Sequence, residues 1–142
     1  MNFDSVLVDS SVPLYALGGP SDLRQPCRAA MDRLAASGVA MFASVEMIQE
    51  VAFHRLRVTG DQVRAAAEAE ALSQVVRLLA FDQAVLRGAL KLMALSAGVR
   101  GRDAVHAATA LAHGIDVVLS TDSAFGSVPG LSLVNPLALS AA

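Results

Sequence analysis

Apolar runs of strand length alternate with longer segments of helical periodicity along the 142-residue chain. The first run, residues 5–9, is apolar until it stops on Asp9, which is typical of a strand buried on both faces of a parallel sheet. Asp9 itself could be a turn residue or a ligand at the edge of that sheet. Strands are predicted at residues 5–9, 39–44, 115–121 and 131–136. The run at 75–79 fits either a strand or a helix.

Capping residues and glycines delimit the predicted helices. Ser11, with Pro13 in the first turn, predicts one helix start, and Ser44 predicts another. The predicted helices run from Ser11 to Gly18, from Ser21 or Asp22 to Gly38, from Ser44 to Thr59, from Asp61 to about Ser73, from Asp82 to about Ala97 and from Asp103 to Gly114.

Strands separated by helices predict a three-layer α/β/α fold with a mostly parallel central sheet of about four to five strands. A chain of 142 residues can bury a core of its own, so a single domain over residues 1–142 is expected. In open α/β sheets, ligands bind at the carboxyl ends of the strands. Functional side chains are therefore expected at that edge.

Four carboxylates are expected at this edge, although they lie far apart in the sequence. Asp9 and Asp122 follow the first strand and the strand at 115–121. Asp103 opens a helix that leads down into the latter strand, so it starts at the same edge. Glu50 lies about five residues into the helix after the second strand, roughly 7 Å below its start. Helical side chains tilt toward the N-terminus, so this longer acid can reach the edge as well.

Each acid also has a purely structural interpretation. Asp9 and Asp122 suit turns, and Asp103 suits a helix N-cap. Glu50 suits a solvated helix surface. Clustered carboxylates, however, repel one another and persist only where protons or a cation neutralise them. Oxygen ligands without Cys or His favour Mg²⁺, for which Mn²⁺ can substitute, and such a metal suits phosphodiester hydrolysis.

Two further residues lie near the predicted metal site in sequence. Glu46 falls in the first turn of the helix that carries Glu50, where the helix dipole favours a carboxylate without any ligand role. His106 follows Asp103 by three positions on an Ala-rich helix face, which is more often a packing position than a ligand position. The sequence leaves open whether Glu46 or His106 touches the site.

Composition and charge limit the remaining choices. The chain is 54% hydrophobic with a net charge of −2, so its average charge does not indicate nucleic-acid binding. Its basic residues all lie between Arg24 and Arg102, and both ends carry acids only. No apolar run is long enough for a membrane span and no secretory leader is evident, so a cytoplasmic protein without membrane association is expected. The lone cysteine, Cys27, is expected to be unreactive.

Four segments resemble the PIN domain family. "LVDSSVPLYA" resembles its first strand and acid, and "ASVEMIQEV" resembles the helix with the second acid, which aligns with Glu50 and not Glu46. "GRDAVHAATALAHGID" is the most specific match, with its acid at Asp103, and "LSTDSAF" resembles the closing motif, with Asp122. The match covers nearly the whole chain, which implies a single PIN domain over residues 1–142.

This short form is similar to VapC toxins of bacterial toxin–antitoxin pairs. The resemblance implies an endoribonuclease that depends on Mg²⁺ or Mn²⁺ and cleaves tRNA or another structured RNA to inhibit translation. It also implies a homodimer held inactive by a cognate VapB-type antitoxin, which commonly inserts an arginine-bearing C-terminal segment into the acidic site. The catalytic and metal-binding residues would be Asp9, Glu50, Asp103 and Asp122.

The resemblance and the residues suggest secondary roles. Ser120 stands where the family often has a threonine that supports the site. Ser10 and Ser11 suit a helix cap, and one of their hydroxyls could orient Asp9. Aromatic residues are few, so RNA is expected to be held by charge and shape rather than base stacking. Candidate phosphate contacts, which could equally be solvated charges, are Arg55, Arg57, Arg100 and Arg102.

Two alternative classes of function stay open. A catalytically inactive PIN-like interaction module would keep the fold without the metal, but retention of all four acids argues against it. The phosphatases and receivers of similar sheets fit poorly. A haloacid-type phosphatase needs Asp-x-Asp, and Ser11 stands two positions beyond Asp9. A receiver domain needs a late lysine, and none follows Lys91.

Overall fold

A five-stranded sheet in the order β3-β2-β1-β4-β5 forms the centre of the computed structural model, which describes residues 1–95 and 98–140. Every pairing between neighbouring strands is parallel. The strands are β1 (Ser5–Val8), β2 (Ala40–Ser44), β3 (Arg77–Leu79), β4 (Val117–Leu119) and β5 (Ser132–Val134). The predicted α/β fold is confirmed, and the ambiguous run at 75–79 contains a strand.

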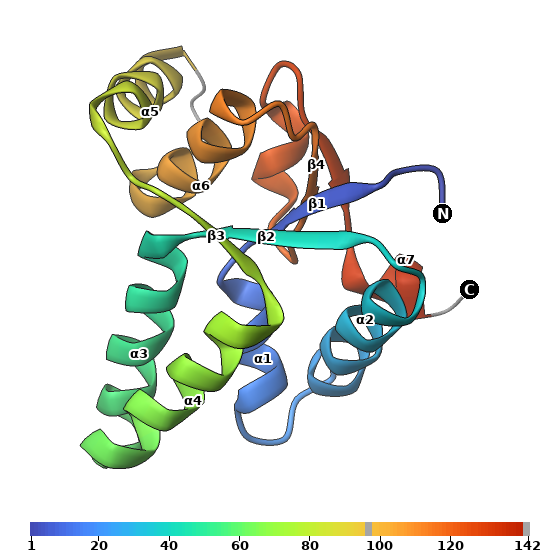
Figure 1. Ribbon diagram of the computed structural model, residues 1–142, viewed down its shortest axis with the longest axis vertical. Coiled ribbons are helices and arrows are strands. Elements are labelled where there is room, and N and C mark those ends of the chain that lie inside the picture. Colours follow the sequence, from blue (N-terminus) through green and yellow to red (C-terminus); the bar gives the residue numbers. More distant parts are fainter. Residues whose placement is uncertain (96–97, 141–142) are drawn as a thin grey trace.

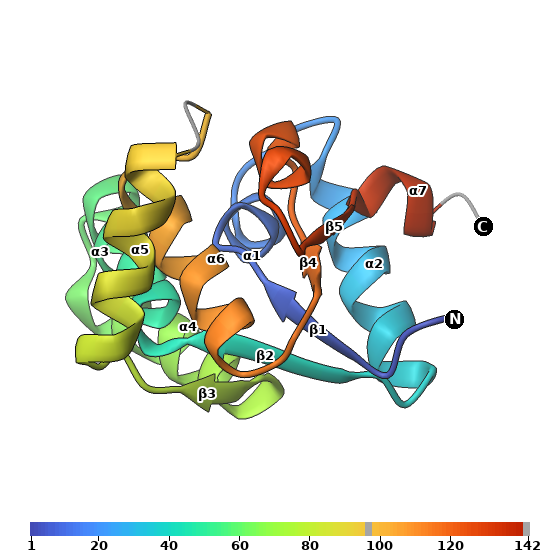
Figure 2. The ribbon, with the colours of Figure 1, turned by 90° about the horizontal axis from the view of Figure 1, so that it is seen from above.

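Helices cover both faces of the sheet (Figure 1). One face carries α1 (Ser11–Leu17), α2 (Arg24–Ala36), α3 (Val45–Thr59), α4 (Gln62–Val75) and α7 (Pro136–Ser140). The other face carries α5 (Gln83–Leu95), α6 (Gly101–Ala112) and the short 3-10 helix η1 (Ser123–Ser127). Seen from above, α5 and α6 lie in front of the sheet, with α3 and α4 behind it (Figure 2). No helix in the described segments is long and apolar enough to cross a bilayer.

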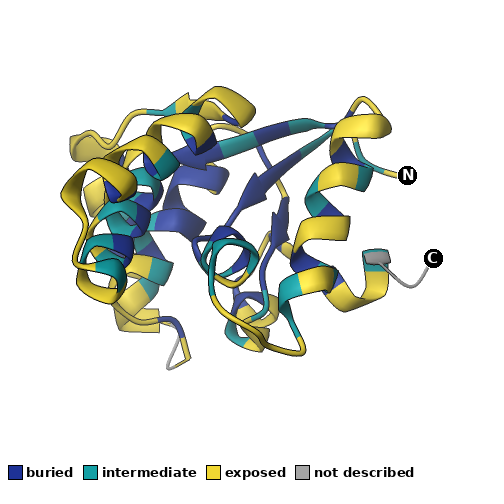
Figure 3. Cartoon of the chain, turned by 90° about the horizontal axis from the view of Figure 1, so that it is seen from below, coloured by how far each residue is buried: buried dark blue, intermediate teal, exposed yellow. Residues whose placement is uncertain are grey.

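Alternation along β1 divides its side chains between two cores. Val6 and Val8 pack beneath α2 and α3 with Leu34 and Met47, whereas Leu7 packs on the opposite face with Phe125 and α6. The central strands β1 and β4 are accordingly almost entirely buried, whereas the edge strand β3 is mostly exposed (Figure 3). Full burial of a Val or Leu side chain contributes about 1.5–3 kcal/mol. The two cores therefore stabilise the packing of helices on both faces of the sheet.

The strand order creates a crevice between β1 and β4. The chain passes from β1 outward to β2 and β3, then crosses back to β4 on the other side of β1. The connections that follow the two strands at such a reversal lead away in opposite directions, and the crevice outside the carboxyl ends is the usual ligand site of open α/β sheets. Asp9 follows β1, and its backbone N–H donates to the Leu119 carbonyl at 3.0 Å. Asp9 therefore stands at the reversal itself.

The predicted cap Ser44 and the predicted break at residues 59–61 fix the two ends of α3. Ser44 Oγ accepts a hydrogen bond from the Met47 N–H at 3.1 Å, so α3 begins directly at the carboxyl end of β2. Asp61 caps α4 in the same way, accepting from the Arg64 N–H at 3.0 Å. Gly60 ends α3 with a φ of +67°, which glycine adopts without strain. Glu50 is thereby held two turns or less from the carboxyl edge.

Three predicted helix starts are wrong. α2 begins at Arg24, after the predicted start at Ser21 or Asp22. α6 begins at Gly101, so Asp103 lies inside its first turn and is not the N-cap. Ser11 is the first residue of α1 rather than its cap, because its hydroxyl instead accepts from the Thr121 N–H at 3.2 Å. A contact across the β1–β4 crevice has replaced the local one. The predicted end of the Asp82 helix at about Ala97 lies outside the described residues.

Candidate active site

The Asp9 carboxylate is buried in the crevice, with only 2% of the residue exposed. Its Oδ2 accepts a hydrogen bond from Ser120 Oγ at 2.8 Å and a longer one from the Ser11 N–H at 3.4 Å. Its Oδ1 is buried and makes no hydrogen bond within the described part of the chain. A buried acceptor without a partner costs about 1–3 kcal/mol, so this oxygen is suited to a cation.

Ser120 connects the ends of β1 and β4. Besides donating to Asp9, its Oγ accepts from the Asp122 N–H at 3.0 Å and lies 3.4 Å from Ser11 Oγ. The structure thus brings Ser120 into the supporting position that the resemblance implied. The cap predicted for Ser10 and Ser11 is wrong, because no side chain caps α1.

Asp103 and Asp122 complete an acidic group around Asp9. Burial raises the pKa of Asp103 to about 7, with further increases from the negative charge of Asp9 and from a hydrogen bond and the charge of Asp122, against a smaller opposing effect of His106. The Asp122 side chain is held by a local contact, because its Oδ1 accepts a hydrogen bond from the Ala124 N–H at 2.9 Å. Asp9 and Asp122 therefore both lie close enough to Asp103 to raise its pKa.

Glu50 lies on α3 beside the same acidic group, but its negative charge is balanced by different neighbours. Burial opposes its ionisation, yet the hydrogen bond and charge of His106, the Ser10 hydroxyl and the Arg102 charge outweigh burial and hold its pKa below the ordinary value. Glu50 Oε1 lies 3.1 Å from His106 Nε2. Ser10 occupies the N-cap position of α1 without a side-chain cap bond, and its hydroxyl instead hydrogen-bonds Glu50.

His106 makes contacts with the site that the sequence interpretation undervalued. It is fully buried on α6, one turn beyond Asp103. Its Nδ1 lies 3.0 Å from Ser44 Oγ, and its Nε2 lies 3.9 Å from Asp9 Oδ1 in addition to the Glu50 contact. The available signal was its three-residue spacing from Asp103, which puts both on one helix face.

The residues named as secondary candidates fall into two groups. Arg55 is buried and its guanidinium bonds Glu68 at 3.0 Å, which argues against the predicted contact with RNA phosphate. The Glu46 carboxylate faces the side-chain amide of Gln49 on the same helix. Arg57, Arg100 and Arg102 are exposed, and Arg57 and Arg102 line a hollow together with Glu50.

The side chains offer a partial metal site. In residues 1–95 and 98–140, no group of three Asp, Glu, His or Cys side chains already converges as a metal cage. Mg²⁺ usually keeps several waters and binds through one or two carboxylates plus substrate phosphate, so a closed cage is not required. The unpaired Asp9 Oδ1 and the crowded Asp103 carboxyl are the donors that fit such an ion.

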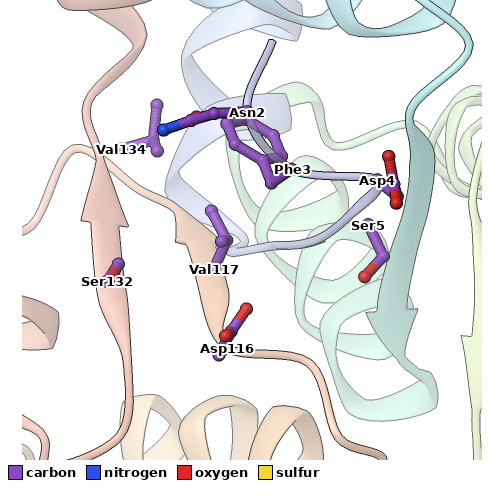
Figure 4. A pocket seen from close by; sticks show the side chains of 8 residues that line it. All are labelled: Asn2, Phe3, Asp4, Ser5, Asp116, Val117, Ser132 and Val134. Atoms are coloured by element: carbon purple, nitrogen blue, oxygen red, sulfur yellow. The ribbon is translucent and has the colours of Figure 1, made fainter.

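A hollow of about 500 Å³ at the opposite edge of the sheet takes no part in this site (Figure 4). It lies at the amino ends of β1, β4 and β5, where Asp4, Asp116 and Ser132 line it. The length of β1, roughly 13 Å, separates it from Asp9. Its lining has neither a basic side chain nor the polar network of the β1–β4 crevice.

The comparison with protein families matches the PIN domain to residues 6–131. Ribonuclease VapC7 of Mycobacterium tuberculosis is 30% identical over 137 residues, which cover 92% of this chain and 91% of the relative. Ribonuclease VapC13 of the same organism is 22% identical over 126 residues, covering 89% of this chain and 96% of the relative.

Solved structures share the fold at lower sequence identity. A DNA-bound VapBC complex from Salmonella typhimurium superposes with a TM-score of 0.73 at 16% identity, covering 93% of this chain and 98% of that chain. Mycobacterium tuberculosis VapC20, described as a Sarcin-Ricin loop cleaving toxin, gives a TM-score of 0.67 at 23% identity, covering 83% of this chain and 90% of that chain. These likenesses extend the agreement in fold across almost the whole length.

Proposed function

The chain belongs to the PIN domain family, and from that membership we propose that it is a metal-dependent endoribonuclease acting as the toxin of a toxin–antitoxin pair. The relatives named ribonucleases support the RNA-cleaving activity. The observation that carries the proposal is the unpaired, buried Oδ1 of Asp9 at the β1–β4 reversal, next to the carboxyls of Asp103 and Asp122.

In this proposal the four carboxylates have different roles. Asp9, Asp103 and Asp122 would hold Mg²⁺ or Mn²⁺, with Glu50 completing the set. When bound, the metal supplies charge that polarises the scissile phosphate and lowers the pKa of the attacking water. Glu50 is kept ionised by His106 and Ser10 and is suited to orient a water molecule by accepting its hydrogen. Ser120 keeps the Asp9 carboxylate from rotating.

The substrate we propose is tRNA or another structured RNA, cleaved to inhibit translation. A relative in fold is described as cleaving the sarcin-ricin loop, which supports a structured target. Arg57, Arg100 and Arg102 are the proposed phosphate contacts, since their side chains are exposed. Such a target agrees with the expected cytoplasmic location.

We also propose a VapB-type antitoxin as partner, because several structures with this fold are VapBC complexes. An arginine inserted into the acidic site would supply the counter-charge that the carboxylates need. An apolar hollow of about 280 Å³ between α1, α2 and α4, lined by Leu17, Met31 and Val75, suits an amphipathic segment of such a partner.

A homodimer is the remaining partner proposal. α5 exposes Leu86, Leu90 and Met93 at helical spacing, so one side of this helix presents a continuous apolar stripe. Apolar stripes of this kind commonly mark contacts between copies of a chain.

The experiment that tests the proposed activity is cleavage of RNA by the purified chain with and without Mg²⁺ or Mn²⁺, followed by sequencing of the new RNA ends. Metal-dependent cleavage at defined positions is expected. An inactive interaction module, the alternative, would bind neither metal in calorimetry and would leave RNA intact.

A further inference from the structure

We propose that the furrow between α1 and α3 is the track that holds the RNA strand beside the acidic site, over about three nucleotides. The inference rests on the proposed function, because it assigns the path of the same substrate. Both helices start at the carboxyl edge of the sheet and run away from it (Figure 1), and side chains of both line common hollows. The furrow begins beside the acidic site, because Glu50 and Ser11 line its first two hollows.

Three hollows follow one another along this furrow. The first, of about 140 Å³, lies between Leu14 of α1 and Glu50 of α3. The second, of about 340 Å³, shares Leu14 and His54 with the first. The third, of about 460 Å³, lies one helical turn further on, at Leu17 of α1 and Val58 of α3. From Glu50 to Val58 the helix rises roughly 12 Å, which matches about three stacked nucleotides at ~3.4 Å each.

Positive charge accompanies the furrow at both ends. Arg57 and Arg102 line the first hollow, and Arg24 lines the third together with Arg64, whose charge is partly balanced by Glu68 at 3.1 Å. The Arg24 Nε is buried and has no hydrogen-bond partner in the described residues. An N–H donor without an acceptor in a cavity beside a second arginine suits a phosphate oxygen. The net charge of −2 hides this local excess of positive charge.

Aromatic side chains line the middle of the furrow. Phe53 is 54% exposed and borders the first hollow, and Tyr15 is 38% exposed and borders the second. His54 lies between them, and its Nδ1 is buried without a hydrogen-bond partner among the described residues. An exposed phenylalanine beside arginines is the arrangement that stacks bases while cations hold the backbone. The chain has few aromatic residues, but Phe53 and Tyr15 lie where the RNA strand would extend away from the acidic site.

The test measures binding of a fluorescent 12-nucleotide single-stranded uridine RNA by anisotropy in EDTA, over a range of KCl concentrations. Phe53→Ala is expected to raise the Kd about fivefold or more through lost stacking. Arg57→Gln is expected to weaken binding and to lower the slope of log Kd against log salt by about 0.7, the value for one phosphate contact on a single strand. Phe81→Ala and Arg87→Gln, on exposed positions away from the furrow, are the matched controls and should bind as the wild type does.

Wild-type RNA cleavage is measured in parallel, so that two failures stay distinct. If the wild type cleaves RNA but both furrow variants bind like the controls, the track is wrong and the proposed function stands. If the variants keep RNA affinity and lose affinity for a glutamate-rich decapeptide, the furrow belongs to a peptide partner and the track is wrong. If the wild type neither binds nor cleaves RNA, the proposed function fails first, and the track fails with it.

Discussion

The imidazole of His106 on α6 and the carboxylate of Glu50 on α3 meet across two helices, with Nε2 3.1 Å from Oε1. Ser44 Oγ already accepts from the Met47 N–H, so its hydroxyl hydrogen is free to point to His106 Nδ1. In the neutral ring that arrangement leaves the proton on Nε2, and in the charged ring Nε2 is protonated as well, so in both forms Nε2 donates to Glu50. The cap of α3 and an acid of the same helix are thus joined through one buried ring.

His106→Leu should therefore raise the pKa of Glu50, because burial then acts without its main opposing contact. Calorimetric Mn²⁺ affinity and RNA cleavage are expected to fall about 10- to 100-fold, as for other residues that orient a metal ligand. His106→Gln retains an N–H donor and should recover much of both. Equal losses in the two variants, at matched thermal stability, would reduce His106 to a packing residue.

Ser120→Ala should weaken the site through Asp9. The substitution removes the 2.8 Å bond to Asp9 Oδ2 and leaves the Asp122 N–H without its acceptor. A 10- to 100-fold loss of cleavage rate is expected, since the carboxylate can then rotate. Ser120→Thr keeps the hydroxyl and should stay close to wild type. Unchanged kinetics in Ser120→Ala would show that Asp9 is held by other contacts.

Asp103→Asn should stabilise the metal-free protein. The pKa of Asp103 is about 7 in the folded chain against an ordinary value of 3.8, so between these values the folded chain keeps a proton that the unfolded chain has released. Stability from this group is therefore lost as pH rises through that window. The melting temperature of the variant should exceed that of the wild type by a margin that grows from pH 5 to pH 8. Added Mg²⁺ should raise the melting temperature of the wild type only.

Leu90→Glu should separate a dimer into monomers. Leu90 is half exposed in the apolar stripe of α5, so a charge there costs little in the monomer and much in an apolar interface. Light scattering after gel filtration measures the mass directly. Val63→Glu, on the exposed surface of α4, is the control. A wild-type chain that is monomeric at every concentration would contradict the dimer.

The fold and the placement of Asp9, Asp103 and Asp122 at the carboxyl edge of the sheet could be predicted from the sequence, because both depend on local signals. The apolar run before Asp9 and the cap at Ser44 are readable from a few adjacent residues. Arg55 and His106 were misjudged because their roles depend on partners distant in sequence: Glu68 on α4, and Glu50 on α3. The cap predicted for Ser11 failed for the same reason, since a backbone group of the β4 end competes for its hydroxyl.

The most direct test of the metal-site account is the rate of RNA cleavage by the wild type, Asp9→Asn and Asp116→Asn, each with Mg²⁺ and with EDTA. Asp116 is an exposed aspartate at the opposite edge of the sheet and serves as the matched control. The account predicts that the wild type and Asp116→Asn cleave only with Mg²⁺, and that Asp9→Asn is at least about 100-fold slower although it folds normally. Cleavage that persists in EDTA, or an Asp9→Asn variant as fast as Asp116→Asn, would contradict it.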